Sequence, residues 1–579
     1  MKRAKFNAFL AVLILAAPLT TFAQSNLDPG QLPKSTALYL AWHGTPSGEA
    51  RKANSLWAMW DDPDFAPVRS AIISAMMGSS ADSTKPKSAL TADALSQYAT
   101  LLDNEFVFGY IANPNPAKAN AAVREAPQTA WNGMFFAYDH TGKEATLAKL
   151  LLQARMNEKE PPKISAATIA GISAIKIERK NGTTYWVDDG KYTFSASEPT
   201  VLEQISAWTK HATPVAARLS QDTAFREAGD LVKGGVAEFF FRFASIRDMD
   251  WDKSVGGFRL RPLVQSLKLE AVHSIAGHLA LEGARTRMES AILGETSAGS
   301  VFDIWDQGTG SPSSWQFITA NTVAYQEWRV NLAGIYALIK RAMQSTASAG
   351  QANPTDFLER AFATRLGMPL PAAIGLFSGE FASLQSSSAL DPAKRVSVVG
   401  IREKAATLKL LRAGLAERVA RERSEGDTTF LKISEGGMAS AAGTASWKYY
   451  HLAVTPDLIV ASKRDESVRE TLAAGKGTSS ENTLVPLAWQ QARKQFPKTV
   501  NGLGFFDFQK IDWTTMKERW IASSRKAPTS GGPQQQAAAD TFANAMKDLD
   551  PRVFPRHLHL TASASWKDAQ GVHFDGWIE

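Results

Sequence analysis

The 579-residue sequence is too long to fold around one ordinary core, and we expect two to four structural units. Hydrophobic residues make up 44% and charged residues 21%, a composition that is typical of folded globular proteins and excludes a disordered chain. The sequence has no cysteine, which excludes disulfides, thiolate metal sites, a cysteine nucleophile and a lipidated N-terminal cysteine.

The first 23 residues have the parts of a secretory signal peptide. Lys2, Arg3 and Lys5 form a positive start, an apolar stretch covers residues 6–19, and a cleavage site follows that ends at Ala23. The apolar stretch is shorter than the roughly 20 residues that a membrane span needs. We therefore predict cleavage near Ala23 and an exported protein, periplasmic or extracellular, that is not an integral membrane protein.

Cleavage also changes the charge of the chain. The signal contains three of the 64 Lys and Arg residues and none of the 57 Asp and Glu residues, so the mature chain has a net charge of +4. A charge this small on so long a chain does not indicate nucleic acid or an anionic membrane as a partner.

The predicted elements of the first half begin with a strand at residues 36–42. In chain order they continue as a helix at 49–60, a helix starting at Asp62, a helix at 89–102, a strand at 104–111, a strand-turn-helix unit at 134–154, a three-stranded meander over 172–194, helices at 200–208 and 223–232, an aromatic strand at 238–243 and strands at 266–271 and 277–288. The meander is predicted from two tight-turn signals, Asn181-Gly182 and Asp188-Asp189-Gly190, between β-rich runs.

The second half repeats this order. The strand-turn-helix unit at 134–154 recurs at 395–415, and the same Ala-Thr-Leu triplet opens both helices. The other matches are Thr36, Tyr39 and Trp42 with Thr322, Tyr325 and Trp328, 64–65 with 356–357, 105–106 with 380–381, 194–197 with 460–463, 240–243 with 505–508, and 279–283 with 572–576. Because the order never changes, the sequence predicts two copies of one unit.

We therefore predict an α+β fold of two homologous repeats, each a mainly antiparallel sheet with helices packed on one face. The predicted boundaries are a signal peptide at 1–23, a first repeat at 24–294, a linker at 295–320 and a second repeat at 321–579. Glycine, serine and proline in 295–320 favour the linker. Whether the repeats share one sheet or form separate domains stays open.

A pair of histidines, His557 and His559, is the best candidate for a metal site, because alternate residues of a strand point to one face. The predicted C-terminal hairpin pairs Trp566 with Val572, which keeps His573 roughly 20 Å from His559 at ~3.4 Å per residue. We therefore predict two solvent-facing histidines and no three-ligand site.

Two acidic groups have simpler interpretations than metal binding. Asp303, Asp306 and Gly308 lack most of the calcium-loop pattern, so we interpret them as a linker turn. Asp62 precedes a proline and is predicted to cap a helix, and Asp64 suits the N-terminus of that helix by its charge.

Sequence motifs for catalysis are weak or missing. The segment Gly44-Thr45-Pro46-Ser47-Gly48 follows a strand, but its serine is one place away from the nucleophile position of G-x-S-x-G. Zincin, Walker and dinucleotide-binding motifs do not occur in the sequence. Tryptophans such as Trp57, Trp60 and Trp186 could line a sugar- or peptide-binding surface, and core packing explains them at least as well. We predict no catalytic, cofactor-binding or metal-binding residue.

The opening Leu32-Pro33-Lys34-Ser35-Thr36, followed by a helix and Asp62-Pro63-Asp64-Phe65, resembles the start of a group of exported bacterial proteins. These proteins carry a domain of unknown function that typically begins LP-x-[DS]-T before a strand and contains repeated strand-helix units. The resemblance implies no activity and no site residue, because none is assigned to the family.

The export signal and the missing catalytic motifs favour a non-catalytic binding or scaffold protein of the cell envelope, with an envelope component or a small ligand as partner and a cleft between the repeats as its site. Two alternatives stay open. A hydrolase would bring a nucleophile and base, or two carboxylates, together only in the fold. A carrier of a lipid or other apolar ligand would need an apolar cavity against the aromatic strands, whereas a scaffold would need a large exposed apolar patch.

Overall fold

The structure is a computed structural model. It describes residues 27–78, 100–112, 133–148, 162–179, 182–247, 254–255, 258–259, 264–306, 313–346, 354–415, 418–434, 449–477, 487–525 and 532–579. The predicted signal peptide, most of the helix predicted at 89–102, the end of the helix in 134–154 and Gly308 lie outside these ranges.

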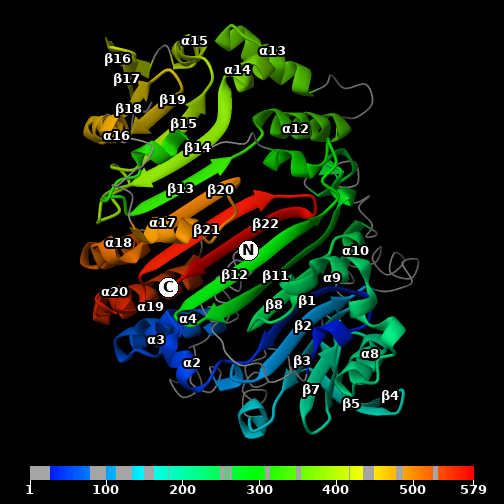
Figure 1. Ribbon diagram of the computed structural model, residues 1–579. Helices are drawn as coiled ribbons and strands as arrows, with labels where there is room; N and C mark the ends of the chain where they lie inside the picture. The colour runs from blue at the N-terminus through cyan, green and yellow to red at the C-terminus, as the bar shows by residue number, and fades with distance from the viewer. Residues whose placement is uncertain are drawn as a thin grey trace.

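One antiparallel sheet of twenty strands contains both halves of the chain (Figure 1). From one end, the strands of the first half are β4 (Lys163–Ile169), β5 (Ile172–Arg179), β6 (Gly182–Asp188), β7 (Tyr192–Ala196), β3 (Met134–Asp139), β2 (Glu105–Ile111), β1 (Thr36–His43), β8 (Ala237–Arg242), β11 (Val272–Glu282) and β12 (Arg285–Gly294). The strands of the second half continue the sheet as β22 (Gly571–Ile578), β21 (Leu560–Lys567), β20 (Gly502–Asp507), β13 (Ala324–Arg329), β14 (Phe377–Gln385), β15 (Val396–Ile401), β19 (Leu458–Ser462), β18 (Tyr449–Val454), β17 (Thr428–Ser434) and β16 (Val419–Glu425). The pairing of β12 with β22 joins the two halves.

The strand order is the same when it is read outward from β12 and from β22. On one side follow β11, β8, β1, β2, β3, β7, β6, β5 and β4, and on the other β21, β20, β13, β14, β15, β19, β18, β17 and β16. The match of 279–283 with 572–576 does not fit this order, because the first segment lies in β11 and the second in β22 rather than in β21.

The local predictions hold where turn residues mark the strand ends. The meander predicted over 172–194 is present as β5, β6 and β7. The strands predicted at 266–271 and 277–288 are wrong in their bounds, because β11 and β12 form a hairpin whose turn contains Gly283 at φ 64°. Glycine adopts this left-handed conformation without a steric penalty, so the turn falls inside the second predicted strand.

The C-terminal hairpin differs from the predicted register by one residue. Trp566 pairs with His573, and Lys567 pairs with Val572. A slip of one residue moves every side chain of a strand to the opposite face of the sheet. His573 and Trp566 therefore lie on one face, where their ring centroids are 5.3 Å apart.

Alternation along the strands defines two faces of the sheet. We call the face that carries Tyr39 and Tyr325 face A, and the opposite face, which carries Trp42 and Trp328, face B. On face A, α8 (Pro199–Thr209) and α9 (Thr223–Ala228) cover the first half, and α16 (Asp465–Gly477) and α17 (Leu487–Arg493) cover the second.

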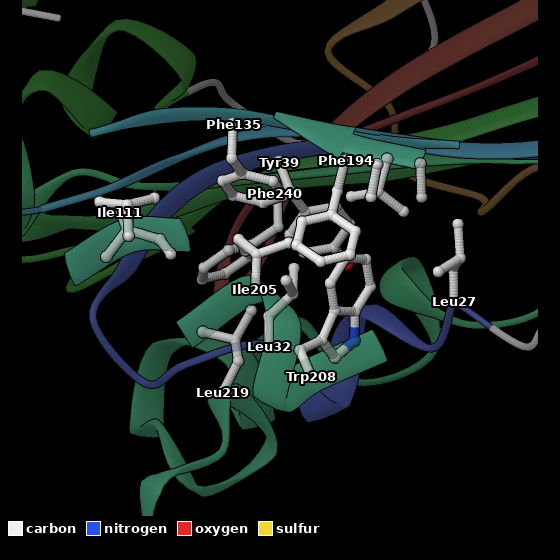
Figure 2. Packing of buried hydrophobic residues seen from close by; sticks show 14 of the residues in the cluster. Leu27, Leu32, Tyr39, Ile111, Phe135, Phe194, Ile205, Trp208, Leu219 and Phe240 are labelled. Atoms are coloured by element: carbon white, nitrogen blue, oxygen red, sulfur yellow. The ribbon is translucent and has the colours of Figure 1, made fainter. Parts of the chain in front are cut away.

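The core of the first half lies between face A and these helices. Figure 2 shows Tyr39 and Phe240 on the strands and Ile205 and Trp208 on α8, with the ring of Phe194 between the two layers. All five side chains are fully buried or nearly so. At about 25 cal/mol per Å² of buried apolar area, such large side chains supply much of the stability of this half.

Helices also pack on face B, so the prediction that helices cover one face only is wrong. Trp57 of α3 (Ser55–Asp61) packs against Trp42 of β1. In the second half, Val460 packs with α16 on face A. The preceding residue, Ile459, packs with Leu408 of α15 (Lys404–Leu415) on face B. Strands that are covered on both faces carry apolar residues at consecutive positions.

The remaining helices lie around the sheet. They are α2 (Gly48–Ala53), α4 (Ala66–Gly78), α10 (Ala244–Arg247), α12 (Leu332–Thr346), α13 (Pro354–Leu366), α14 (Leu370–Gly375), α18 (Trp513–Arg525), α19 (Gly532–Asp548) and α20 (Val553–His557). Helices α3, α4, α18, α19 and α20 share one apolar cluster and gather beside the strand ends in the middle of the sheet (Figure 1). Within the described ranges, none of the helices has the length and apolar character needed to cross a membrane.

Candidate functional site

A row of glycines, serines and one glutamine crosses face B in the second half. From strand to strand the directly paired residues are Gly576, Ser563, Gly504, Gln326 and Ser383. The neighbouring rows carry large side chains, Trp328 and Phe381 on one side and Phe506 and Gln385 on the other, so this row forms the floor of a groove. The groove contains a pocket of about 370 Å³.

One wall of the pocket is the loop between β14 and β15, through Leu390 and Pro392. Leu390 adopts φ 49°, a left-handed conformation that is uncommon for a residue other than glycine. Helix α18 and the residue before it hold this loop in place, since the backbone N–H of Asp512 donates to the carbonyl of Ser388 at 2.9 Å and Arg519 donates to the carbonyl of Ala389. Strained backbone that its surroundings hold in place is common at ligand-binding sites.

The wall also contains a buried amide without a full set of partners. Gln385 is 8% exposed, and its Nε2 donates to the carbonyl of Asp391 at 3.0 Å. Its Oε1 has no hydrogen-bond partner among the described residues. A buried acceptor without a partner costs about 1–3 kcal/mol, so this oxygen favours a donor from a molecule in the pocket.

Arg395 lies beside this amide, directly before β15. Its Nε donates to Ser383 Oγ at 2.6 Å, which holds the guanidinium over the floor of the groove. No carboxylate in the part of the chain that the structure describes forms an ion pair with Arg395, and every other described residue that lines the pocket is uncharged. The pocket is therefore electropositive.

The corresponding surface of the first half is filled. The row in register there is Gly277, Phe239, Leu40 and Phe108, so large apolar side chains stand where the second half has Gly504, Gln326 and Ser383. The matched tryptophans differ in the same way. Trp42 is 1% exposed beneath α3, whereas Trp328 is 42% exposed beside the groove.

On face A, the same strand β13 carries a buried carboxyl group. Glu327 is fully buried, and its Oε2 accepts from Trp315 Nε1 at 2.6 Å and from the Tyr325 hydroxyl at 2.5 Å. Its Oε1 has no partner within the described ranges. Burial raises the pKa of Glu327 to about 7, although hydrogen bonds from Tyr325 and Trp315 and the charge of Arg329 act in the opposite direction.

The first half has an equivalent tyrosine–glutamate pair, in which a different strand supplies the glutamate. The Tyr39 hydroxyl donates to Glu238 Oε1 at 3.2 Å. Glu238 belongs to β8 and pairs with Ala41, whereas Glu327 belongs to β13 and pairs with Leu503. Burial raises the pKa of both tyrosines well above its ordinary value. The buried tyrosine–carboxylate contact is thus present in both halves. In the first half the glutamate lies on the strand next to that of the tyrosine, and in the second half both residues lie on one strand.

The structure places the histidine candidates apart from the groove. His557 ends α20 and does not lie on a strand, and its Nε2 is 2.7 Å from Asp62 Oδ2. His559 is exposed. Across the described ranges, no group of three or more residues that could hold a metal ion occurs. The expectation for Asp62 is confirmed, since its side chain accepts from the backbone N–H of Asp64.

The other candidate residues serve local structure. Asp303 accepts from the backbone N–H of Gly299 at 2.6 Å, and Asp306 pairs with Lys567 at 2.8 Å. Trp57 packs in the core with its ring 6.3 Å from that of Trp60. No sequence motif marks Gln326, Gln385 or Arg395, because only the pairing of β13 with β14 and of β14 with β15 brings them together.

Comparison with known proteins found no match to the chain among family models, curated proteins or solved structures.

Proposed function

We propose that this chain is an exported, non-catalytic binding protein of the cell envelope and that its ligand site is the groove on face B of the second half. The pocket carries the proposal, because it combines a buried acceptor without a partner, Gln385 Oε1, with an arginine that has no acidic partner among the described residues. The site expected from the sequence was a cleft between the repeats, whereas this groove lies within the second half.

The lining favours binding over hydrolysis. It contains the hydroxyls of Ser383, Thr561 and Ser563, and none of its described residues is a histidine, a lysine or a carboxylate that could act as a general base. The apolar carrier is supported less well, because the lining carries two glutamines and an arginine. A small ligand with polar groups fits this site better than a lipid tail.

We also propose that the chain arose by duplication of an α+β unit, with repeats at 24–294 and 321–579 joined by 295–320. Equivalent hydrogen bonds from a backbone N–H to a glutamate support this origin, and they match Ser313, within the predicted linker, with Leu27 of the first repeat. The N–H of Leu27 donates to Glu105 Oε2 at 3.2 Å, and the N–H of Ser313 donates to Glu380 Oε2 at 3.3 Å. Tyr39 and Tyr325 are separated by 286 residues, as are Leu27 and Ser313.

Export is proposed from the first 23 residues and from the LP-x-[DS]-T opening at 32–36, which resembles that of exported bacterial proteins. A location outside the cytoplasm gives the binding protein access to envelope components and to small molecules that enter the periplasm.

Filling the groove is expected to remove a co-purified ligand. Ser563 is exposed on the floor between Gly504 and Gly576, so Ser563→Leu places an isobutyl group in the pocket without displacing a core residue. Native mass spectrometry of protein purified from its own envelope should show a bound small molecule on the wild type that the variant lacks.

The matched control is Ser173→Leu, which adds the same side chain to an exposed position of β5 outside the groove. This variant should carry the ligand as the wild type does. A wild-type protein of clean unliganded mass, or equal ligand on both variants, would contradict the proposed site.

A further inference from the structure

We infer that the groove selects a small molecule that carries one anionic group, a carboxylate or a phosphate, next to a hydroxyl or N–H donor. This inference rests on the proposed function, since it names the ligand class of the same site. It depends on Arg395, on Gln385 and on the size of the pocket.

Arg395 supplies the anion contact. Because its Nε is bonded to Ser383 Oγ, its two terminal nitrogens stay available, and no described carboxylate pairs with them. A guanidinium fixed through one nitrogen presents a planar pair of donors, which matches the oxygens of a carboxylate or phosphate. An acidic or a neutral ligand would both fit the space, but only an anion would compensate the charge.

Gln385 supplies the acceptor next to it. Leu384 pairs with Val396 across β14 and β15, so Gln385 and Arg395 are the next residues at the ends of the same two strands. Both line the pocket on face B. A ligand whose anionic group contacts Arg395 therefore has Gln385 Oε1 as the adjacent acceptor for its hydroxyl or N–H group.

The pocket limits the size of the ligand. Its volume of about 370 Å³ is at the small end of the roughly 300–1,000 Å³ that small-molecule sites occupy. A single sugar acid, sugar phosphate or amino-acid derivative has this size. The exposed ring of Trp328 is two residues beyond Gln326 on the same face and does not line the pocket.

Isothermal titration calorimetry of the mature chain tests the inference with probes of matched size. We expect glucuronate or glucose 6-phosphate to bind at least tenfold more tightly than glucose, and glucosamine to bind more weakly than glucose. Tighter binding of glucuronate would identify a carboxylate ligand, and tighter binding of glucose 6-phosphate would identify a phosphate ligand. Both results support the inference.

Variants assign the two contacts. Arg395→Gln should reduce the affinity for the anionic probe at least tenfold and remove its preference over glucose, whereas Arg395→Glu should reverse the preference toward glucosamine. Gln385→Met should weaken binding of glucuronate but not of acetate, which has no donor. Circular dichroism of each variant checks folding, which we expect to be retained because Arg395 is exposed and because methionine fills a volume similar to that of the buried Gln385.

Two results separate the inference from the proposed function. If glucose and the anionic probes bind equally, or if no anionic probe binds at millimolar concentration, the ligand class is wrong. The groove itself would still stand if Ser563→Leu removed the co-purified molecule. If Ser563→Leu changed neither the co-purified ligand nor the binding of any probe, the proposed function would fall as well.

Discussion

Replacing Arg287 with methionine is expected to lower the free energy of unfolding by about 3–5 kcal/mol, because it leaves a buried carboxylate without its cation. Asp575 is 5% exposed, and its two oxygens accept from Arg287 Nε at 2.9 Å and from a terminal nitrogen of Arg287 at 2.8 Å. The pair joins β12 to β22, so it holds the two halves of the sheet together.

A second carboxylate increases the expected loss. Glu289 is directly opposite Asp575 in the ladder, and the same terminal nitrogen of Arg287 lies 2.7 Å from Glu289 Oε1. Like charges directly opposite on neighbouring strands are destabilising, and here one guanidinium neutralises both. Glu289 and Asp575 are separated by 286 residues, so these acids occupy equivalent places in the two halves, whereas the residue equivalent to Arg287 is His573.

The matched control for Arg287→Met is Arg412→Met. Arg412 pairs with Glu422 at 2.5 Å, but its side chain is 53% exposed, so we expect a loss below about 1 kcal/mol. Urea denaturation gives the free energy of unfolding of both variants from the midpoint and slope of the transition. Adding Asp575→Asn to Arg287→Met should recover part of the stability, because the uncompensated charge is then absent. Equal losses for Arg287→Met and Arg412→Met would show that the pair does not hold the halves together.

The α+β class, the antiparallel pairing and the meander could be predicted because each depends on residues close in the chain. Gly182 and Gly190 mark tight turns, and β-rich residues on both sides pair across them. The register of the C-terminal hairpin could not be chosen in this way. Both faces of β22 carry large apolar side chains, Val572 and Phe574 on one and Trp577 on the other, so alternation alone allows either register.

The groove was not predicted because its residues come from four strands that are distant in the sequence. A signal was nevertheless present in the matches between the two halves. Leu40 and Phe108 stand where the second half has Gln326 and Ser383, which replaces two large apolar side chains with polar ones. Such a change between equivalent positions predicts that this face is apolar in one copy and polar in the other.

The pH dependence of stability is expected to carry a contribution from Glu327 of unusual sign. Its pKa is about 7 in the folded protein, above the ordinary value of 4.5, because the side chain is buried. Between these values the folded state keeps a proton that the unfolded state has lost. Stability from this group is therefore fully present below about pH 4.5 and decreases by about 3 kcal/mol as the pH rises to about 7.

Glu327→Gln should remove this contribution, because glutamine does not ionise and its carbonyl oxygen can still accept from Trp315 and Tyr325. We expect the variant to be more stable than the wild type near pH 8, by up to about 3 kcal/mol, and of similar stability near pH 4.5. The charges of Arg329 and Glu380 act on this carboxyl in opposite directions and remain in the variant.

Urea titrations from roughly pH 4.5 to 8 measure the difference between the two proteins. The control is Glu422→Gln, because a hydrogen bond from Arg412 lowers the pKa of Glu422, so this substitution cannot stabilise the protein near pH 8. Two results together would show that Glu327 is ionised in the fold. The Glu327→Gln variant would be less stable than the wild type near pH 8, and the stability of both proteins would change equally with pH between pH 5 and 7. The unpartnered Oε1 would then need a cation or a water cluster on face A, and β13 would carry a polar site on each of its two faces.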